Sequence, residues 1–355
     1  MDEKQRGGYR SLFWPVVLIG AGVVALLGNL DILSRANIVV LFRLWPLLLI
    51  LIGIDIMFGH RSPAIGAVIG IGAVALVIGL MLVGPSLGLG DDGEVKTDTF
   101  AEPIGETTSA RVSLDLSSGP TEISALSDSN DLIEAQVKYI GKIEFDVQGE
   151  REKSISLRRR DDFGFAWFDW FDEDDEMRWD ISLSPQVPLD LGVDGSSGPL
   201  ALDLRELQLT GLDLDVGSGP VDGSLPATAG RYDVRVDGGS GPCKLSLADG
   251  ADVDLETEVG SGPFTIKIGD NADVNLRADG GSGPLTIEVP EDAAVRVDVR
   301  DRGSGRVRLP GGFERTRSGD DDEGTWETPG FGNADHKIEI IIEDMGSGDV
   351  EVRKG

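Results

Sequence analysis

A tetrapeptide close to Gly-Ser-Gly-Pro returns at a near-constant interval and limits what this chain can fold into. Its third residue falls at Gly119, Gly198, Gly219, Gly241, Gly262, Gly283, Gly305 and Gly348. From Gly198 onward the steps are 21, 22, 21, 21 and 22 residues, and the last step of 43 residues corresponds to two periods. A fixed period of this size is typical of proteins built from stacked repeats.

Apolar and polar residues alternate on both sides of the motif. After it, apolar residues occupy every second position, as in Phe264, Ile266 and Ile268, and before it Val253 and Leu255 alternate with acidic residues. This alternation indicates short strands with one buried face. Each repeat therefore predicts a strand, a corner, a second strand and a polar turn. Equivalent strands stacked about 4.8 Å apart form a parallel β-solenoid, which is the fold class we expect for this all-β body.

The repeated glycines are interpreted as structural corner residues, because glycine lets successive corners approach closely without a clash between Cβ atoms. These corner residues are Gly198, Gly219, Gly241, Gly262, Gly283, Gly305 and Gly348. A phosphate-binding loop is the functional alternative, but neither a lysine nor a helix start follows the glycines. The single cysteine, Cys243, occupies a slot that is apolar in the other repeats, so we expect a buried side chain and not a reactive thiol.

Two insertions interrupt the period, at about residues 158–180 and 311–337. The first places aromatic residues among many acids. Its aromatic side chains are candidate contacts for a partner protein, and the alternative is a cover over the open end or side of the coil. The candidate contacts are Trp167, Phe168, Trp170, Phe171 and Trp179. The second insertion is rich in glycine and acidic residues, which predicts a mobile loop.

The first 90 residues predict an α-helical anchor in the lipid bilayer. No charge occurs from Ser11 to Leu30 or from Ala64 to Gly90, and each run reaches the roughly 20 residues that a bilayer crossing needs. Between them, Ile38–Phe58 carries charges only near its ends. We expect about three spans, at residues 12–30, 38–58 and 64–85. Residues 91–110 then form a linker and first strand, and residues 111–355 form the solenoid.

Basic residues indicate the orientation of this anchor. Cytoplasmic segments are enriched in Lys and Arg, which favours a cytoplasmic N-terminus with Lys4, Arg6 and Arg10, and places Arg61 on the same side. With three spans, the C-terminal domain of this multi-pass cell-membrane protein lies outside the cytoplasm. If the middle segment does not cross, the same rule places that domain inside.

Charge and composition narrow the function. The net charge is −30, and residues 1–90 hold four acids and six bases, so the remaining body carries −32. Such a body is repelled by phosphate backbones, which argues against a nucleic-acid partner. With one cysteine and two histidines, the sequence offers no metal spacing and no Ser-His-Asp order, so we expect no enzyme and no cofactor.

Outward carboxylates remain as candidates for weak binding of calcium. Asp213 and Asp215 lie on one face of a predicted strand, and such columns on adjacent coils supply oxygen ligands. The alternative is a solvated face with ladders of ion pairs, to which Arg235, Arg277, Arg296 and Arg300 contribute.

Two long segments suggest a family. "LFWPVVLIGAGVVALLGNLDIL" and "LFRLWPLLLILIGIDIMFG" each contain Trp-Pro, which recurs after 31 residues. They resemble the paired membrane segment of LiaI/LiaF-like bacterial proteins, and the glycine-punctuated body resembles the toastrack-type adhesin domain that often follows it. The resemblance implies a cell-envelope stress response, in which LiaF-like proteins restrain a membrane sensor kinase until damage relieves the restraint. No catalytic residues come with the family. This chain differs in its longer body, aromatic insertion and acidic excess.

Three functional hypotheses follow. In the first, a sensory or regulatory protein binds another envelope or membrane protein, such as a sensor kinase, through its solenoid. In the second, a structural or adhesive module forms homo-oligomers through the ends of the coil, because the last coil, "GSGDVEVRKG", leaves an uncapped edge. The third, a carbohydrate-active enzyme, is least favoured, because coils of about 21 residues leave little room for a cleft.

Overall fold

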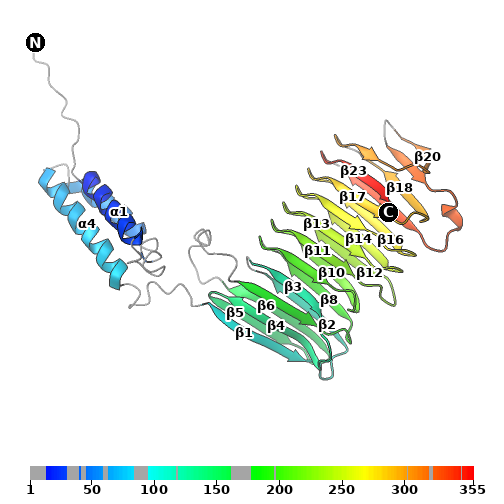
Figure 1. Cartoon of the computed structure of the whole chain (residues 1–355), viewed down its shortest axis with the longest axis horizontal. Coiled ribbons are helices and arrows are strands. Elements are labelled where there is room, and N and C mark those ends of the chain that lie inside the picture. Colours follow the sequence, from blue (N-terminus) through cyan, green and yellow to red (C-terminus); the bar gives the residue numbers. More distant parts are fainter. Residues whose placement is uncertain are drawn as a thin grey trace, which may run out of the picture. The chain divides into compact units, whose positions relative to one another are not determined.

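A computed structural model describes residues 13–29, 40, 45–58, 63–83, 95–116, 119–160, 177–195, 197–301, 303–319, 323–344 and 346–355. The chain divides into two compact units, Met1–Glu94 and Val95–Gly355 (Figure 1). The first unit is helical and the second is built almost entirely of β-strands.

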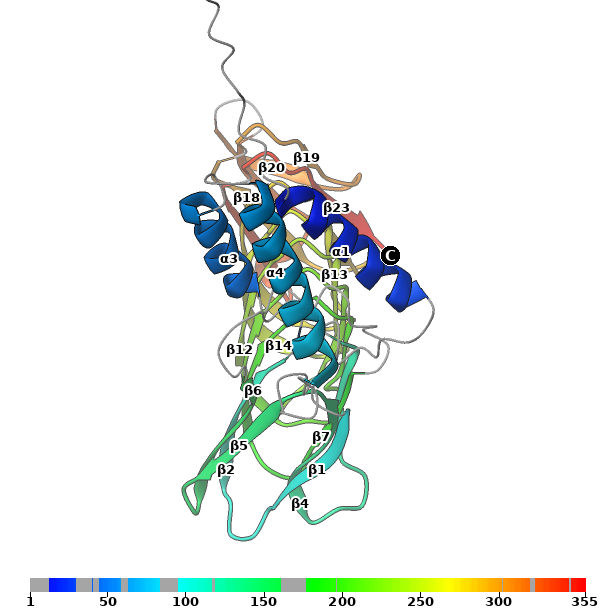
Figure 2. The same cartoon turned by 90° about the vertical axis from the view of Figure 1, so that its left-hand side faces the viewer.

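The helical unit contains α1 (Phe13–Asn29), α3 (Trp45–Phe58) and α4 (Pro63–Val83). Helix α4 packs against both α1 and α3 (Figure 2). The α1–α4 contact is close at Gly20, where an added Cβ would lie 2.6 Å from Cγ2 of Val74. Apolar side chains such as Leu18 and Val68 stay exposed. Among the described helices, none combines the length and the apolar character that crossing a membrane requires.

The second unit consists of two large sheets. The strands of sheet A are, in spatial order, β1 (Lys96–Pro103), β4 (Asp131–Tyr139), β7 (Arg178–Leu183), β3 (Thr121–Ala125), β9 (Leu200–Asp203), β11 (Val221–Leu225), β13 (Cys243–Leu247), β15 (Phe264–Lys267), β17 (Leu285–Val289), β23 (Val350–Lys354) and β19 (Val307–Arg308). The strands of sheet B are β20 (Glu314–Ser318), β21 (Gly324–Glu327), β18 (Val295–Val299), β22 (Ile338–Asp344), β16 (Asp273–Asp279), β14 (Asp252–Glu258), β12 (Tyr232–Asp237), β10 (Leu209–Asp215), β8 (Leu189–Asp194), β2 (Ser109–Asp115), β6 (Glu152–Arg160) and β5 (Lys142–Gln148).

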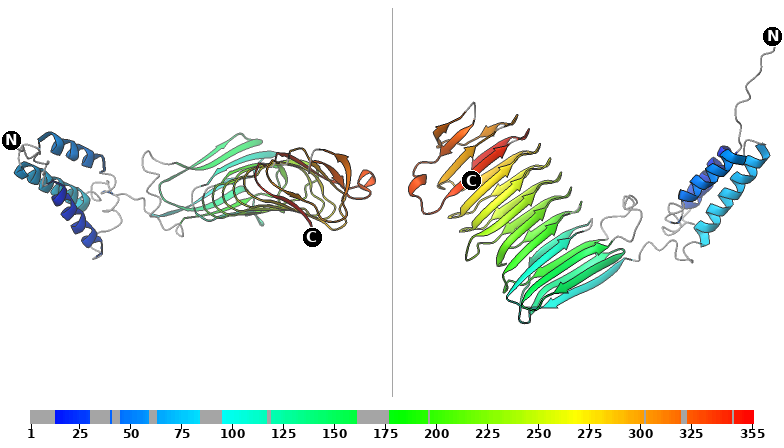
Figure 3. Two further views of the ribbon diagram at one scale, coloured as in Figure 1. Left: turned by 90° about the horizontal axis from the view of Figure 1, so that it is seen from above. Right: turned by 180° about the vertical axis from the view of Figure 1, so that it is seen from behind.

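Each repeat contributes one rung, which we define as a strand of sheet B followed along the chain by a strand of sheet A. Equivalent strands of successive rungs pair in parallel and in register, as Leu255 does with Leu276 and Cys243 with Phe264. Alternate side chains point between the two sheets and form one continuous core, in which Leu255 is 1% exposed. The predicted body of stacked parallel strands is therefore confirmed (Figures 1 and 3).

The corners join the two strands of a rung and stack directly on one another. A Cβ on Gly219 would overlap the carbonyl oxygen of Gly198, and the same relation holds between Gly241 and Gly219. Beside this column, the backbone N–H of Cys243 donates a hydrogen bond of 2.9 Å to the carbonyl of Pro263 in the next rung. The proline carbonyl therefore accepts a hydrogen bond at the corner, where no strand pairing needs the N–H that proline lacks. The glycine is required because backbone fills the space where a side chain would begin.

The order of rungs in space differs from their order in the chain at both ends. The rung β6/β7 lies outside β2/β3, and the last rung, β22/β23, lies between β16/β17 and β18/β19. The expectation that the last coil leaves an uncapped edge is therefore wrong, because β23 is flanked by β17 and β19. The chain passes beyond this position to form β18/β19 and then returns to fill it.

The second insertion is ordered where the structure describes it. Strands β20 and β21 pair with each other, and β21 pairs antiparallel with the outer edge of β18. The segment ends in a short 3-10 helix, η5 (Phe331–Asn333). The guanidinium carbon of Arg296 lies 4.4 Å from the ring centroid of the buried Phe331. These residues form paired strands where the sequence predicted a loop, because β18 offers an edge that the hairpin covers.

Replacing Gly241 by alanine is expected to lower the free energy of unfolding by about 3 kcal/mol, because the new Cβ would meet the backbone of the neighbouring corner. The matched control is Gly230→Ala, since nothing lies within 4 Å of a Cβ at Gly230. That change should alter the free energy by less than about 1 kcal/mol. Urea unfolding followed by circular dichroism measures both, and equal effects would contradict the close packing of the corners.

Candidate functional site

The aromatic candidates of the first insertion lie only partly within the structure. Trp167, Phe168, Trp170 and Phe171 fall outside the described residues. Trp179 lies in β7 with 0% of its surface exposed, opposite Thr121 of β3 and Val137 of β4. The expectation that Trp179 contacts a partner is therefore wrong, because the residue occupies an inward position and packs in the core.

The cysteine is not a reactive site. Cys243 is 4% exposed and packs in the core at the start of β13. Burial, with a smaller effect of the Asp222 carboxylate, raises the pKa of this thiol to about 12. Because the thiolate is the reactive form of cysteine, Cys243 is not suited to nucleophilic or redox chemistry at neutral pH.

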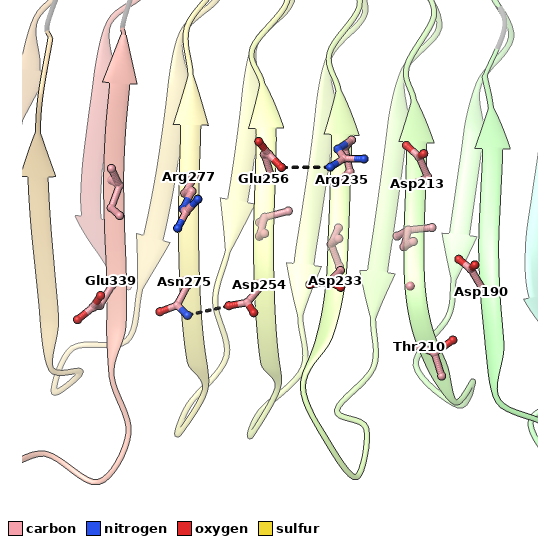
Figure 4. Close-up of a pocket in the computed structure, with 15 residues that line it drawn as sticks. Asp190, Thr210, Asp213, Asp233, Arg235, Asp254, Glu256, Asn275, Arg277 and Glu339 are labelled. Atoms are coloured by element: carbon pink, nitrogen blue, oxygen red, sulfur yellow. Dashed lines mark hydrogen bonds and ion pairs between the residues drawn. The ribbon is translucent and has the colours of Figure 1, made fainter.

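The outer face of sheet B carries a shallow groove of about 760 Å³ across β8, β10, β12, β14, β16 and β22 (Figure 4). Polar side chains of adjacent strands interact along it. Arg235 forms an ion pair of 3.3 Å with Glu256, and Nδ2 of Asn275 donates a hydrogen bond of 2.7 Å to Oδ1 of Asp254. The groove therefore has a charged, partly self-paired floor that is open to solvent.

The ladder of ion pairs predicted from the sequence exists in part. Besides Arg235, Arg296 contacts Glu327 at 2.8 Å and Arg300 contacts Glu343 at 2.6 Å. Arg277 lies in register with Glu256 and with Ile341, and no ion pair joins Arg277 to any described residue. Arginines of sheet B also pair toward its N-terminal end, as Arg111 does with Asp190 at 2.8 Å, so Arg277 is the member of the predicted ladder without an ion pair among the described residues.

A row of carboxylates runs across sheet B beside the corners. We call it the acid row; its members occupy matching positions on seven neighbouring strands and are Asp115, Asp194, Asp215, Asp237, Glu258, Asp279 and Asp344. All seven side chains are exposed. No ion pair joins a member to any cation among the described residues, so the charges face solvent without a counter-charge from that part of the chain.

Neighbouring members of the acid row affect one another. Although Asp215 is exposed, partial desolvation of its carboxyl by the sheet, followed by the carboxylates of Asp194, Asp237 and Asp213, raises the pKa of Asp215 above its usual value. Burial and the Asp115 carboxylate likewise raise the pKa of Asp194. Like charges on directly opposite positions of paired strands are destabilising, and together they create a strong local negative potential. This face therefore favours contact with a positively charged partner.

The described residues contain no group of three or more His, Cys, Asp or Glu side chains arranged to hold a metal ion. The outward pair Asp213 and Asp215 belongs to the open face described above and not to an enclosed cage. His336 lies 2.9 Å from Asp273, which also accepts the backbone N–H of Lys337 at 3.0 Å. These contacts fasten the start of β22 to β16, so the role they support is structural.

A second groove, of about 440 Å³, follows the corners on the outer side of sheet A. The proline column forms its apolar wall, consisting of Pro120, Pro199, Pro220, Pro242 and Pro263. The charged residues along this groove are of both signs: the acids Glu122 and Asp222 lie beside the bases Arg178 and Lys244. Because its charges are of both signs, unlike those of the acid row, this groove does not indicate the charge of a partner.

The acid row was missed from the sequence, although a signal for it exists. An acidic residue stands four positions before the third residue of each of the eight copies of the motif, and Asp301 before Gly305 is the one of these acids outside the acid row. Asp213 and Asp215 are neighbours along one strand, whereas the acid row runs across strands. The row emerges only when corners are aligned and strands are paired in register.

The chain is similar to known families and structures. Residues 13–96 match the model of the LiaF transmembrane domain, and residues 91–246 match that of the N-terminal domain of toast_rack, DUF2154. A candidate cell adhesion protein from Clostridium sporogenes ATCC 15579 is 17% identical, with 74% of this chain and 100% of that chain covered and a TM-score of 0.39. A candidate adhesin from Bacteroides fragilis NCTC 9343 is 13% identical, with 72% and 97% covered and a TM-score of 0.28. No curated protein matches the chain.

Replacing Asp215 by asparagine is expected to raise the free energy of unfolding by a few tenths to about 1 kcal/mol at pH 7 and low salt. The folded state raises the pKa of Asp215, so it binds this proton more tightly than the unfolded state does. Stability therefore falls as pH rises from the unfolded pKa through the folded pKa, and the full cost is present at pH 7. The gain should shrink in 1 M salt, where charges are screened within about 3 Å.

Thermal unfolding at low and high salt measures this effect. The control is Asp222→Asn on sheet A, because Asp222 lies opposite Lys244 and not opposite another acid. We expect no gain there. A gain of equal size at both positions, or one that salt leaves unchanged, would show that the acid row carries no special repulsion.

Proposed function

We propose that this protein, in which a match to the LiaF transmembrane domain precedes a match to the N-terminal domain of toast_rack, is a non-enzymatic, membrane-anchored regulator of a cell-envelope stress response. It senses or transmits the state of the envelope through protein–protein contacts of its solenoid. The partner is another envelope or membrane protein, and a membrane sensor kinase is the candidate that the resemblance implies.

One observation carries this proposal: the seven carboxylates of the acid row are exposed and have no ion pair with any described cation. The face that bears them is open along neighbouring rungs, so a protein surface can lie across several strands at once. A basic surface would supply the missing counter-charges and would be attracted at long range. We therefore place the partner contact on the outer face of sheet B.

The self-associating alternative has less support from the ends of the solenoid. At one end, edge strand β1 carries Lys96 and Asp98 and finishes at Pro103. At the other end, β19 has only two residues, and β20 is fully exposed with two arginines. Short or charged edge strands and proline discourage pairing with another chain. These features favour a partner contact on a sheet face over an end-to-end assembly.

The carbohydrate-active alternative also has less support. Catalysis on a glycoside requires carboxylates placed on both sides of a bound sugar within a cleft. Here the carboxylates lie in rows on an open sheet, and Asp254 and Glu256 in the groove already interact with Asn275 and Arg235. The groove therefore resembles a contact surface more than a substrate cleft.

For the anchor, we propose about three spans, with the C-terminal domain outside the cytoplasm. The two charge-free segments and the basic residues before residue 12 support this topology. A reporter enzyme that is active only outside the cytoplasm, fused after Gly355, is expected to be active. A second fusion, with a reporter active only in the cytoplasm, should be silent. The reverse pattern would place the acid row inside the cell and would overturn this topology.

The regulatory role is tested in a host strain that lacks the gene and carries a transcriptional reporter of the envelope stress response. Restoring the wild-type gene should restore regulation under a wall-active antibiotic. A variant with Asp215→Asn and Glu258→Gln should restore it incompletely. Losing two charges is expected to weaken the contact by about 1 kcal/mol, roughly fivefold in affinity.

The matched control carries Asp222→Asn and Glu288→Gln, which remove the same side-chain types from the outer face of sheet A. It should behave like the wild type, and immunoblots should show equal amounts of all three proteins in the membrane. If deleting the gene leaves the reporter unchanged, the regulatory role is wrong. If deletion changes the reporter but both double variants restore it fully, the role stands and the acid row is not the contact.

A further inference from the structure

The last rung, β22/β23, separates two rungs in space that follow one another in the sequence at the regular period. Residues 274–279, "VNLRAD", form most of β16, and residues 295–300, "VRVDVR", which include β18, follow one period of 21 residues later. In the structure these segments are not neighbours, because β22 lies between them. The sequence period alone would stack β18/β19 directly on β16/β17.

The geometry on the two sides of β22 is compatible with that direct stacking. Ile338 is paired with Val274 of β16 on one side and with Val295 of β18 on the other, so both strands already share one register. The connector 290–294, between β17 and β18, has five residues and spans two rungs. The connector 268–272, between β15 and β16, also has five residues and spans only one rung. A connector of five residues therefore suffices for a step of one rung, as direct stacking requires.

Direct stacking would also pair opposite charges. In the common register, Arg277 would lie opposite Asp298, and Asp279 would lie opposite Arg300, which follows it by 21 residues. In the observed arrangement, Arg277 lies opposite the uncharged Ile341, and Asp279 lies opposite Asp344 of like charge. Opposite charges on facing positions stabilise a strand pair and like charges destabilise it.

We infer that the C-terminal rungs of this solenoid have two arrangements. In the sequential arrangement, β18/β19 stacks directly on β16/β17 and β22/β23 lies outside. In the intercalated arrangement, β22/β23 lies between them, as the structure has it. The two differ in which strand follows β16 and in which strand covers the outer edge of β18, because β22 would there replace β21. The parallel strands β16, β18 and β22 keep one register and their inward faces in both.

Contacts made late in the chain hold the intercalated arrangement. Arg296 contacts Glu327 of β21 at 2.8 Å and Glu339 of β22 at 3.0 Å, so it joins the hairpin to the inserted strand. The backbone N–H of Val295 donates a 2.9 Å hydrogen bond to the buried hydroxyl of Thr328. Because these partners follow β18/β19 in the chain, the sequential arrangement is available first during synthesis, which proceeds from the N-terminus.

The exchange changes which strand lies at the edge of sheet A. In the intercalated arrangement the edge is β19, which has two residues. In the sequential arrangement it is β23, a five-residue strand. A longer unprotected edge is a better template for pairing with another chain. The sequential arrangement is thus the one in which this end of the domain can bind an added strand.

Pairs of cysteines on the outer face of sheet B distinguish the two arrangements in the full-length protein. A disulfide needs Cα atoms about 4.4 to 6.8 Å apart, which adjacent strands satisfy and strands two positions apart do not. Arg277→Cys with Ile341→Cys reports the intercalated arrangement, and Arg277→Cys with Asp298→Cys reports the sequential one. All variants carry Cys243→Val, because valine fills the matching slot at Val221.

Two further pairs serve as controls. Glu256→Cys with Arg277→Cys joins adjacent strands in both arrangements and reports a folded sheet. Arg235→Cys with Arg277→Cys joins strands two positions apart in both, and its bridged fraction sets the background. Bridging is measured by gel mobility after mild oxidation of the protein in native membranes.

The bridge between positions 277 and 341 should dominate in the otherwise unchanged protein, with the 277–298 bridge at background. Adding Ile340→Asp places a charge in the core, where Ile340 is 0% exposed, and should expel β22 from between β16 and β18 to the end of the stack or out of the sheet, where the charge can reach water. The 277–298 bridge should then rise from background to the main species, and the 277–341 bridge should be lost. If the 277–298 bridge stays at background while the 256–277 bridge persists, the inference is wrong. Loss of the 256–277 bridge would also overturn it, since the inner rungs would then depend on β22.

Discussion

Backbone contact at the corners is the constraint on which the rest of this domain depends. Strands of adjacent rungs pair at about 4.8 Å, and the corners must stack with the same spacing. A Cβ on Gly219 or Gly262 would overlap the carbonyl of the corner before it, so only glycine fits. Because the corners stack, every strand keeps its register, and a residue type that recurs in the repeat becomes a continuous row on a face. The acid row and the proline column both arise in this way.

The stacked strands could be predicted from the sequence, but their order at the ends could not. Alternation around Phe264 and Ile266 identifies strands and their buried face, and the regular spacing of glycines identifies the stack. Neither signal says which strand neighbours which, because Val274, Val295 and Ile338 are the first inward-facing residues of strands of the same pattern and fit one register. The choice depends on tertiary contacts of the hairpin β20–β21, whose acidic, glycine-rich sequence suggested a loop.

The acidic character of the candidate surface could be predicted from the sequence, but its arrangement could not. The excess of acid in the body was evident, yet its concentration into one row required the alignment of Asp215, Asp237 and Glu258 across paired strands. Trp179 shows the opposite error. It stands near many acidic and aromatic residues, which suggested an exposed surface, but it alternates with Ile181 and Leu183 along β7 and points into the core. The local period of two was a better guide than the surrounding composition.

A repeat of this kind also makes the domain extensible. Duplication or loss of one unit of about 21 residues adds or removes one strand from each sheet, and the glycines at the junction still meet backbone of the same shape. The length of the domain would then change in steps of about 4.8 Å, while the chemistry of each face is copied along with it. Evolution can thus adjust the length of such a domain by whole units, without redesigning the interior.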